Sequence, residues 1–257
     1  MQLDALIINP RRRIAWSAID LGIVFAKQHF KQALLVYLLL ATPVLLLSLL
    51  LFDASSMWSF LMLWWFKPLY ERPVLFLMSR ELFADRVDFA RVIREWRSWL
   101  LPDLLRSLTI RRLNINRGFY APVMLLERAD SDVYAQRIGV LGARASSEAT
   151  WLNIVLYHCE NFISLALVML LGLLMPEHFE NQLSLVISGT FEVSWGSNVL
   201  MMVCMALIAP LYVSACFCLY ICRRIELEGW DIEICFRDWV SKLPPAAESE
   251  SVSGIQA

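Results

Sequence analysis

The stretch VLMMVCMALIAPLYVSACFCLYIC, residues 199–222, contains twenty-four residues and no charged side chain. A helix needs about 20 mostly apolar residues to cross a bilayer core about 30 Å thick. The stretch therefore predicts a membrane-spanning helix. The whole chain agrees, because 58% of its 257 residues are hydrophobic and 18% are charged, whereas soluble proteins average about 45–50% and about 25%. This composition excludes an ordinary soluble domain.

Three further stretches are apolar enough to suggest membrane spans. Residues 33–52 hold no charge, and residues 151–175 are interrupted by polar side chains only near their start. Residues 57–78 are irregular, because Pro68 and Pro73 lie there among charged residues. Proline lacks a backbone donor, and a bend inside a membrane is tolerated only where protein or water satisfies the freed groups. We predict four membrane-spanning helices, the second of them kinked.

The basic residues are distributed unevenly along the chain. Five lie in residues 1–32, twelve in residues 79–150 and four in residues 223–257, while residues 53–56 and 176–198 contain none. Loops rich in Lys and Arg stay on the cytoplasmic side of a membrane. We therefore expect a multi-pass membrane protein with both termini in the cytoplasm.

The remaining segments are predicted to be helices outside the hydrocarbon. Residues 14–30 form an amphipathic pattern suited to the inner membrane surface. Ser131 is a plausible N-cap for a helix that leads towards the third span, and Gly139 and Gly142 leave room for a break in it. The predicted organisation is a cytoplasmic amphipathic segment (1–32), two spans (33–78), an Arg-rich cytoplasmic helical insert (79–150), two spans with an outer loop at 176–198 (151–222), an interfacial helix (223–243) and a disordered tail (244–257). The predicted fold class is all-α, a polytopic helical membrane protein with about four transmembrane helices plus interfacial and cytoplasmic amphipathic helices.

Charged residues inside the predicted spans form the first candidate site. Each costs roughly 2.5–3.5 kcal/mol at mid-membrane, so such residues usually pair with one another. The simplest pairing joins Glu160 to Lys67 or Arg72, with Glu71 on the same helix face as Lys67. Three interpretations of the cluster are open: a polar site for a lipid headgroup, a proton or a small solute; an ion-pair lock between spans; or charges at the inner interface of a shallower second span. Its members are Lys67, Glu71, Arg72, His158, Glu160 and Asn161.

Arginines form the second candidate site. The chain has 19 Arg and 4 Lys, and residues 79–150 contain no Lys. The guanidinium fork binds phosphate and carboxylate groups through two hydrogen bonds. The alternative is that these arginines only follow the rule that cytoplasmic loops are basic. The candidates for binding a partner or a headgroup are Arg106, Arg111, Arg112 and Arg117 in the insert, and Arg223, Arg224, Glu226, Glu228, Asp231 and Glu233 after the last span.

Motifs for enzymatic chemistry are absent from the sequence. It has no phosphate-binding loop, no nucleophile elbow, no zinc-protease motif and no dinucleotide-binding fingerprint. The histidines, His29, His158 and His178, fall at different depths or sides of the predicted membrane, so we expect no metal site and no cofactor. The net charge of −1 argues against a nucleic-acid partner held by bulk electrostatics.

Three runs carry a resemblance to a known family. They are AIDLG at 18–22, WWFKPLYER at 64–72 and RRIELEGWDIEICFR at 223–237. Residues 10–240 resemble a family of uncharacterised bacterial inner-membrane proteins. The last run is also similar to the end of the membrane domain of some glycerophosphodiester phosphodiesterases, whose catalytic barrel has no counterpart here. The family resemblance implies a multi-helix scaffold in a bacterial inner membrane, encoded in some cases near MoxR-type ATPases, and no catalytic residues.

These observations favour a non-enzymatic subunit or scaffold of an inner-membrane assembly. Its expected partners are membrane lipids and other inner-membrane or cytoplasmic proteins, including a MoxR-type ATPase system. The alternative is a protein that binds or transports a lipid or small solute through the intramembrane charged cluster, and that forms an oligomer because four spans are few for a transporter. An intramembrane enzyme using Glu160 and His158 is the weakest of the three hypotheses.

Overall fold

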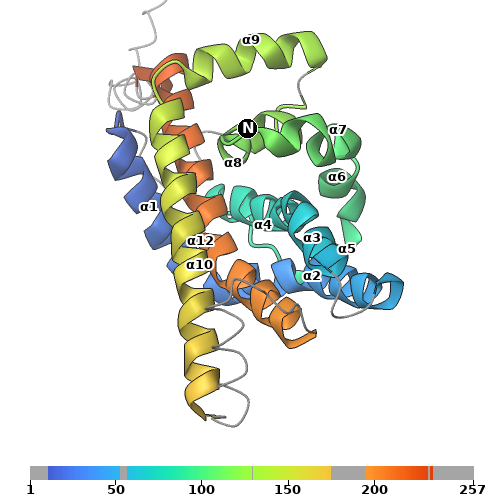
Figure 1. Ribbon diagram of the computed structural model, residues 1–257. Coiled ribbons are helices and arrows are strands. Elements are labelled where there is room, and N and C mark those ends of the chain that lie inside the picture. The colour runs from blue at the N-terminus through green and yellow to red at the C-terminus, as the bar shows by residue number, and fades with distance from the viewer. Residues whose placement is uncertain (1–10, 53–56, 129, 175–194, 231, 234–257) are drawn as a thin grey trace, which may run out of the picture.

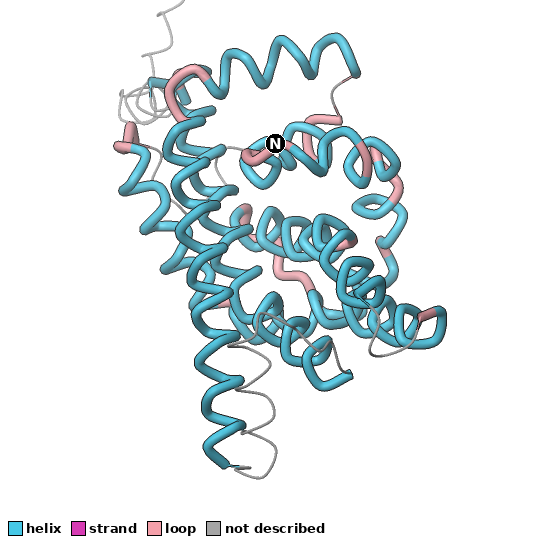
Figure 2. The backbone as a smooth tube through the Cα atoms, in the orientation of Figure 1, coloured by secondary structure: helices cyan, strands magenta, loops and turns pink. Residues whose placement is uncertain are grey.

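The computed structural model of the chain describes residues 11–52, 57–128, 130–174, 195–230 and 232–233. Every regular element in these residues is a helix, and Figure 2 shows no strand among them. The prediction of an all-helical fold is therefore confirmed for the described part of the chain.

Three described helices are long and apolar enough to cross a membrane. They are α2 (Phe30–Leu51), α10 (Ser146–Leu174) and α12 (Trp195–Glu228). Each overlaps a predicted span, and α12 extends beyond residues 199–222 at both ends. Figure 1 shows α10 beside α12, and α2 running across the lower part of the view at a steep angle to α10. The three helices thus do not form a simple parallel bundle.

The second predicted span consists of two helices. α3 (Met57–Trp65) ends and α4 (Lys67–Leu82) begins on either side of Phe66. Pro68 lies in the first turn of α4, where a missing N–H group costs no helical hydrogen bond. Pro73 lies within α4, and the helix is buried along most of its length. The predicted kink is therefore a complete break, and α4 belongs to the protein interior.

α12 is the central helix, in contact with α1 (Ala15–Gln28), α2, α4 and α10. α1 packs along α12, with a closest approach at Gly22. A Cβ atom at Gly22 would lie 2.5 Å from the Cα of Ala215 and 2.6 Å from the carbonyl oxygen of Ser214. The side chains of α1 that this packing buries are Ala18, Ile19, Phe25 and Ala26.

The insert folds into a series of short helices against this frame. The break expected before the third span follows Gly142, where a Cβ atom would lie 2.4 Å from the hydroxyl of Tyr120. Figure 1 shows α9 (Ser131–Gly142) above α8 (Arg117–Leu125) and α7 (Leu104–Leu108), next to the start of α10. The helices of the insert are α5 (Phe89–Arg94), α6 (Trp96–Leu100), α7 (Leu104–Leu108), the 3-10 helix η2 (Ile110–Leu113), α8 (Arg117–Leu125) and α9 (Ser131–Gly142).

Alanine substitutions at Gly22 and Gly139 provide a matched test of the α1–α12 packing. Gly22→Ala should destabilise the protein by about 1–3 kcal/mol, because the added methyl group meets the backbone of α12. Gly139→Ala on α9 adds the same methyl group with no atom within 4 Å, so it should stabilise by about 0.5–1 kcal/mol through helix propensity. Unfolding in mixed micelles measures both. Equal effects of the two substitutions would contradict the close contact.

Candidate functional site

Lys67 and Glu160 form an ion pair between α4 and α10. The distance from Lys67 Nζ to Glu160 Oε2 is 2.5 Å, and each side chain is 11% exposed. The sequence suggested Lys67 or Arg72 as the partner of Glu160, and in the structure the partner is Lys67. Two buried charges stabilise each other only while both are present, since removing one leaves the other without hydration or partner.

Arg72 has a different role, on the side of α4 that faces the insert. Its guanidinium donates to the carbonyl oxygens of Leu100 at 2.7 Å and Pro102 at 2.9 Å, and to the hydroxyl of Ser107 at 2.7 Å. These groups belong to the end of α6, the following turn and α7. Arg72 therefore joins α4 to the insert and does not reach Glu160.

Arg112 closes the end of α3. It donates to the carbonyl oxygens of Trp64 at 3.0 Å and Trp65 at 3.1 Å, and its guanidinium lies 4.1 Å from the ring centre of Trp64. The break at Phe66 leaves these carbonyls without helical partners. Arg112 is 4% exposed. Burial lowers its pKa to about 10, so the group stays charged at neutral pH, and no carboxylate pairs with it in the described part of the chain.

Arg117, at the start of α8, pairs with Glu71 of α4. Its Nη2 lies 3.1 Å from Glu71 Oε1. The Nε atom of Arg117 is buried and has no hydrogen-bond partner among the described residues. Lys67 and Glu71 lie one helical turn apart, as the sequence predicted, but each pairs with a different helix.

These groups surround a cavity of about 150 Å³, which we name the polar cavity. Lys67, Arg112 and Arg117 contribute three positive charges to its wall, and Glu160 contributes one negative charge. Glu71 neutralises Arg117 from the other side, which leaves one excess positive charge. The rest of the wall comprises Trp64, Asn153, Leu156, Tyr157, Ile208, Ala209 and Tyr212.

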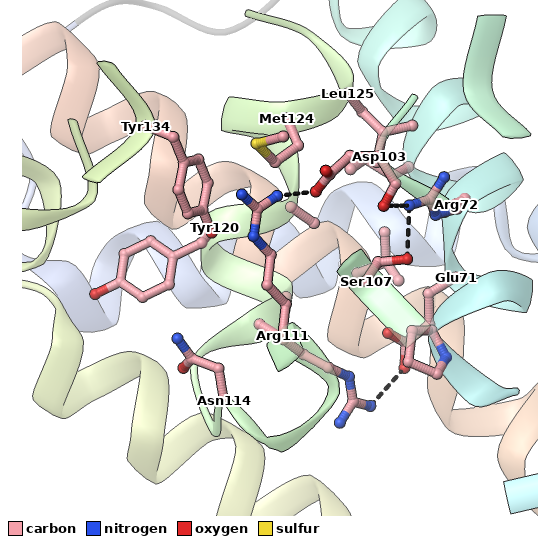
Figure 3. Close-up of a pocket in the computed structure, with 16 residues that line it drawn as sticks. Glu71, Arg72, Asp103, Ser107, Arg111, Asn114, Tyr120, Met124, Leu125 and Tyr134 are labelled. Carbon is pink, nitrogen blue, oxygen red and sulfur yellow. Dashed lines mark hydrogen bonds and ion pairs between the residues drawn. The ribbon is translucent and has the colours of Figure 1, made fainter. Parts of the chain in front are cut away.

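A second cavity, of about 70 Å³, shares Arg117 with the first. Figure 3 shows Arg111 of this second cavity beside Asp103. Arg111 crosses the cavity, paired with Asp103 and with its guanidinium 3.8 Å from the ring centre of Tyr134. Much of the remaining wall is apolar, including Met124 and Leu125. Both carboxylates in its wall, Glu71 and Asp103, are paired with arginines. We name it the apolar cavity.

His158 and Asn161 do not join the buried pair. Both are exposed on α10, and their hydrogen bonds stay within that helix. His158 Nδ1 lies 2.8 Å from the carbonyl oxygen of Ile154, and Asn161 donates to that of Tyr157 at 2.7 Å. The predicted intramembrane cluster thus separates into an interior part and an outward-facing part.

The candidate residues at the end of α12 bind residues of the insert. Arg224 lies 2.7 Å from Glu228 and 3.5 Å from Glu127, and Glu226 lies 3.3 Å from Arg144. Arg223 pairs with Glu226 within the same helix. The basic insert and the acidic helix end therefore contact each other.

Three candidate residues remain. The side chain of Arg106 is 54% exposed, with its Nε 3.7 Å from Asp103 Oδ1. Glu233 is exposed. Asp231 lies outside the described residues.

Sequence analysis missed several residues of the two cavities. The sequence could have indicated Asp103 as an ion-pair partner, since it is the only acidic residue between Glu95 and Glu127 and lies among many arginines. The sequence could not indicate Asn153 and Tyr212, because a single polar residue in an apolar helix does not reveal which face is buried. Among the described residues, no three His, Cys, Asp or Glu side chains lie close enough to hold a metal ion.

No protein-family model, curated protein or solved structure matches the chain. The site is therefore interpreted from its geometry and charge.

The Lys67–Glu160 pair can be tested with a double-mutant cycle. Glu160→Gln should destabilise the protein by about 3–5 kcal/mol, because it leaves Lys67 buried without a carboxylate. Lys67→Met combined with Glu160→Gln should recover much of that loss. The measurement is unfolding in mixed micelles, with Asp132→Asn on the exposed start of α9 as the control. Additive effects of the two single substitutions would exclude a coupled pair.

The contact between α9 and α12 should depend on salt. Arg137 of α9 pairs with Glu127 at 3.0 Å and also with Glu228, and the hydrogen bond with Glu127 raises the pKa of Arg137. Arg137→Gln should speed amide hydrogen exchange in α9 and remove its dependence on ionic strength. Gln136→Ala, on the exposed face of α9, is the control. Unchanged exchange in Arg137→Gln would show that apolar packing alone holds α9.

Proposed function

We propose that the chain is an integral membrane protein that binds an anionic group in the polar cavity and performs no chemistry on it. The observation that carries this proposal is the charge of Arg112, which is 4% exposed and has no carboxylate partner among the described residues. A buried charge without a counter-ion is costly. An anion in the cavity would supply the missing negative charge.

The donor set favours phosphate or carboxylate as the anion. Arg112 and Arg117 offer planar forks and Lys67 offers a compact ammonium group, a combination suited to oxyanions. A cavity of about 150 Å³ has room for several waters or one phosphate group. The proposed ligand is therefore an oxyanion, either the phosphate of a lipid headgroup or a phosphate or carboxylate group of a small solute.

The topology proposed with this function has four crossings and cytoplasmic termini in a bacterial inner membrane. Three crossings correspond to α2, α10 and α12, and the broken pair α3–α4 would form the other. The absence of Lys and Arg from residues 53–56 and 176–198 supports external loops at those positions.

Binding can be measured with two probes on protein purified in mild detergent. Dihexanoyl phosphatidylglycerol represents a lipid, and inorganic phosphate represents a free solute. Asn153→Trp should weaken binding at least tenfold, because it fills the cavity and leaves its charges in place. Arg94→Gln, an exposed arginine of the insert that lines neither cavity, should have no effect. Preference for the lipid would identify a headgroup site, and preference for phosphate would identify a solute site.

Two results would exclude the proposal. One is the absence of binding of either probe to wild-type protein, and the other is equal binding to wild type and Asn153→Trp. Arg112→Lys provides a further check, because it keeps the charge and loses the fork. The substitution should reduce the free energy of oxyanion binding by more than it reduces the free energy of unfolding of the unliganded protein.

The scaffold remains a second candidate, favoured by a specific surface. The far end of α10 carries exposed apolar side chains, including Phe162 and Leu173, and Figure 1 shows this end projecting beyond the other described helices. Lipid or another membrane protein can cover such a surface. Recovery of a stoichiometric membrane partner or a MoxR-type ATPase from native membranes, in place of a retained anion, would favour the scaffold.

A further inference from the structure

Five aliphatic side chains protrude from the surface of the insert. Leu105, Ile110 and Leu113 are 78%, 81% and 76% exposed, and Leu101 and Ile115 are more than half exposed. We name these five residues the apolar edge. They lie within fifteen residues of sequence, outside every predicted span, and soluble surfaces rarely group large aliphatic residues in this way.

Residues 101–115 contain one exposed charged side chain, that of Arg106, and it is positive. Residues 104–126 contain four arginines and no acidic residue. Arg106 is exposed beside the edge, whereas Asp103, the nearest acid, is 12% exposed and paired with Arg111. Exposed aliphatic groups next to an exposed arginine suit the boundary of a bilayer, where apolar side chains meet acyl chains and a guanidinium reaches lipid phosphates.

Several polar groups at and next to the apolar edge are paired within the chain. The amide of Thr109 donates to the carbonyl oxygen of Leu105 at 3.0 Å, and its hydroxyl donates to the same oxygen at 2.7 Å. The amide of Asn116 donates to the side chain of Asn114 at 2.8 Å. Irregular backbone near hydrocarbon requires this internal pairing.

We propose that the apolar edge is inserted in the bilayer interface, so that the insert is a membrane-bound element and not a cytoplasmic domain. Figure 1 places α6 and α7 on the side of the molecule away from α1 and α10, which gives this surface room for lipid. The inference rests on the membrane assignment and does not require ligand binding. Its consequence for the site is that η2, which carries Arg112, lies near lipid phosphates.

Spin labels at the apolar edge test the proposal in the full chain. Leu105→Cys, Ile110→Cys and Leu113→Cys are labelled one at a time, with Cys159 and Cys235 replaced by Ser. The cysteines of α12 are buried and can stay. The protein is placed in nanodiscs of phosphatidylethanolamine and phosphatidylglycerol. Collision rates of each label with oxygen, which concentrates in lipid, and with a water-soluble nickel chelate are then measured. Gln136→Cys on the exposed face of α9 is the matched control.

The expected result is that oxygen collisions exceed nickel collisions at all three positions of the edge, with the reverse at position 136. Higher nickel than oxygen accessibility at the edge would place it in water and overturn the proposal. Low accessibility to both reagents would mean that a second copy or another protein covers the edge, which would also overturn it. Neither result would affect the phosphate and lipid binding measurements, so the two proposals fail separately.

Discussion

The break at Phe66 is the constraint on which the rest of the structure depends. It leaves the carbonyl oxygens of Trp64 and Trp65 without helical donors, and an unpaired buried carbonyl costs about 1–3 kcal/mol. Arg112, which supplies the donors at 3.0 and 3.1 Å, is more than forty residues away in the insert. The broken span and the insert must therefore fold against each other. For this reason the insert is not an independent domain, although its length suggests one.

The same chemistry recurs where other elements meet, and it favours arginine over lysine. Arg72 binds two carbonyl oxygens and a hydroxyl at the α6–α7 turn. A lysine ammonium group cannot span such a set, whereas a planar guanidinium with five donors can. Arg117 binds Glu71 and lines both cavities. Several arginines that the sequence suggested as binding sites for external headgroups thus hold the helices together. The abundance of arginine indicated which groups these side chains bind but not where they lie.

The parts of the structure that could be predicted depend on the local sequence, and the parts that could not be predicted depend on contacts between distant segments. Long apolar stretches predicted the existence of α2, α10 and α12, because crossing length and composition are local properties, but they did not predict that α12 continues to Glu228. Prolines and charges in residues 57–78 indicated a bend, and the sequence also suggested the pairing of Lys67 with Glu160. Sequence could not show that His158 faces outward while Glu160 faces inward. These residues are two positions apart on one helix, and only the packing of α10 on α12 and the ion pair with Lys67 of α4 decide which is buried.

The sign of the charge in the polar cavity follows from the break. An ion-pair lock needs equal charges, and Lys67 with Glu160 already meets that need. Arg112 is present because α3 ends at the cavity wall and needs donors, so it adds a positive charge that no carboxylate there balances. α4 begins at the same wall with Lys67, and the first turn of a helix carries a partial positive charge of its own. A break satisfied by a cation therefore creates an electropositive cavity, and an anion is the ligand that such a cavity stabilises.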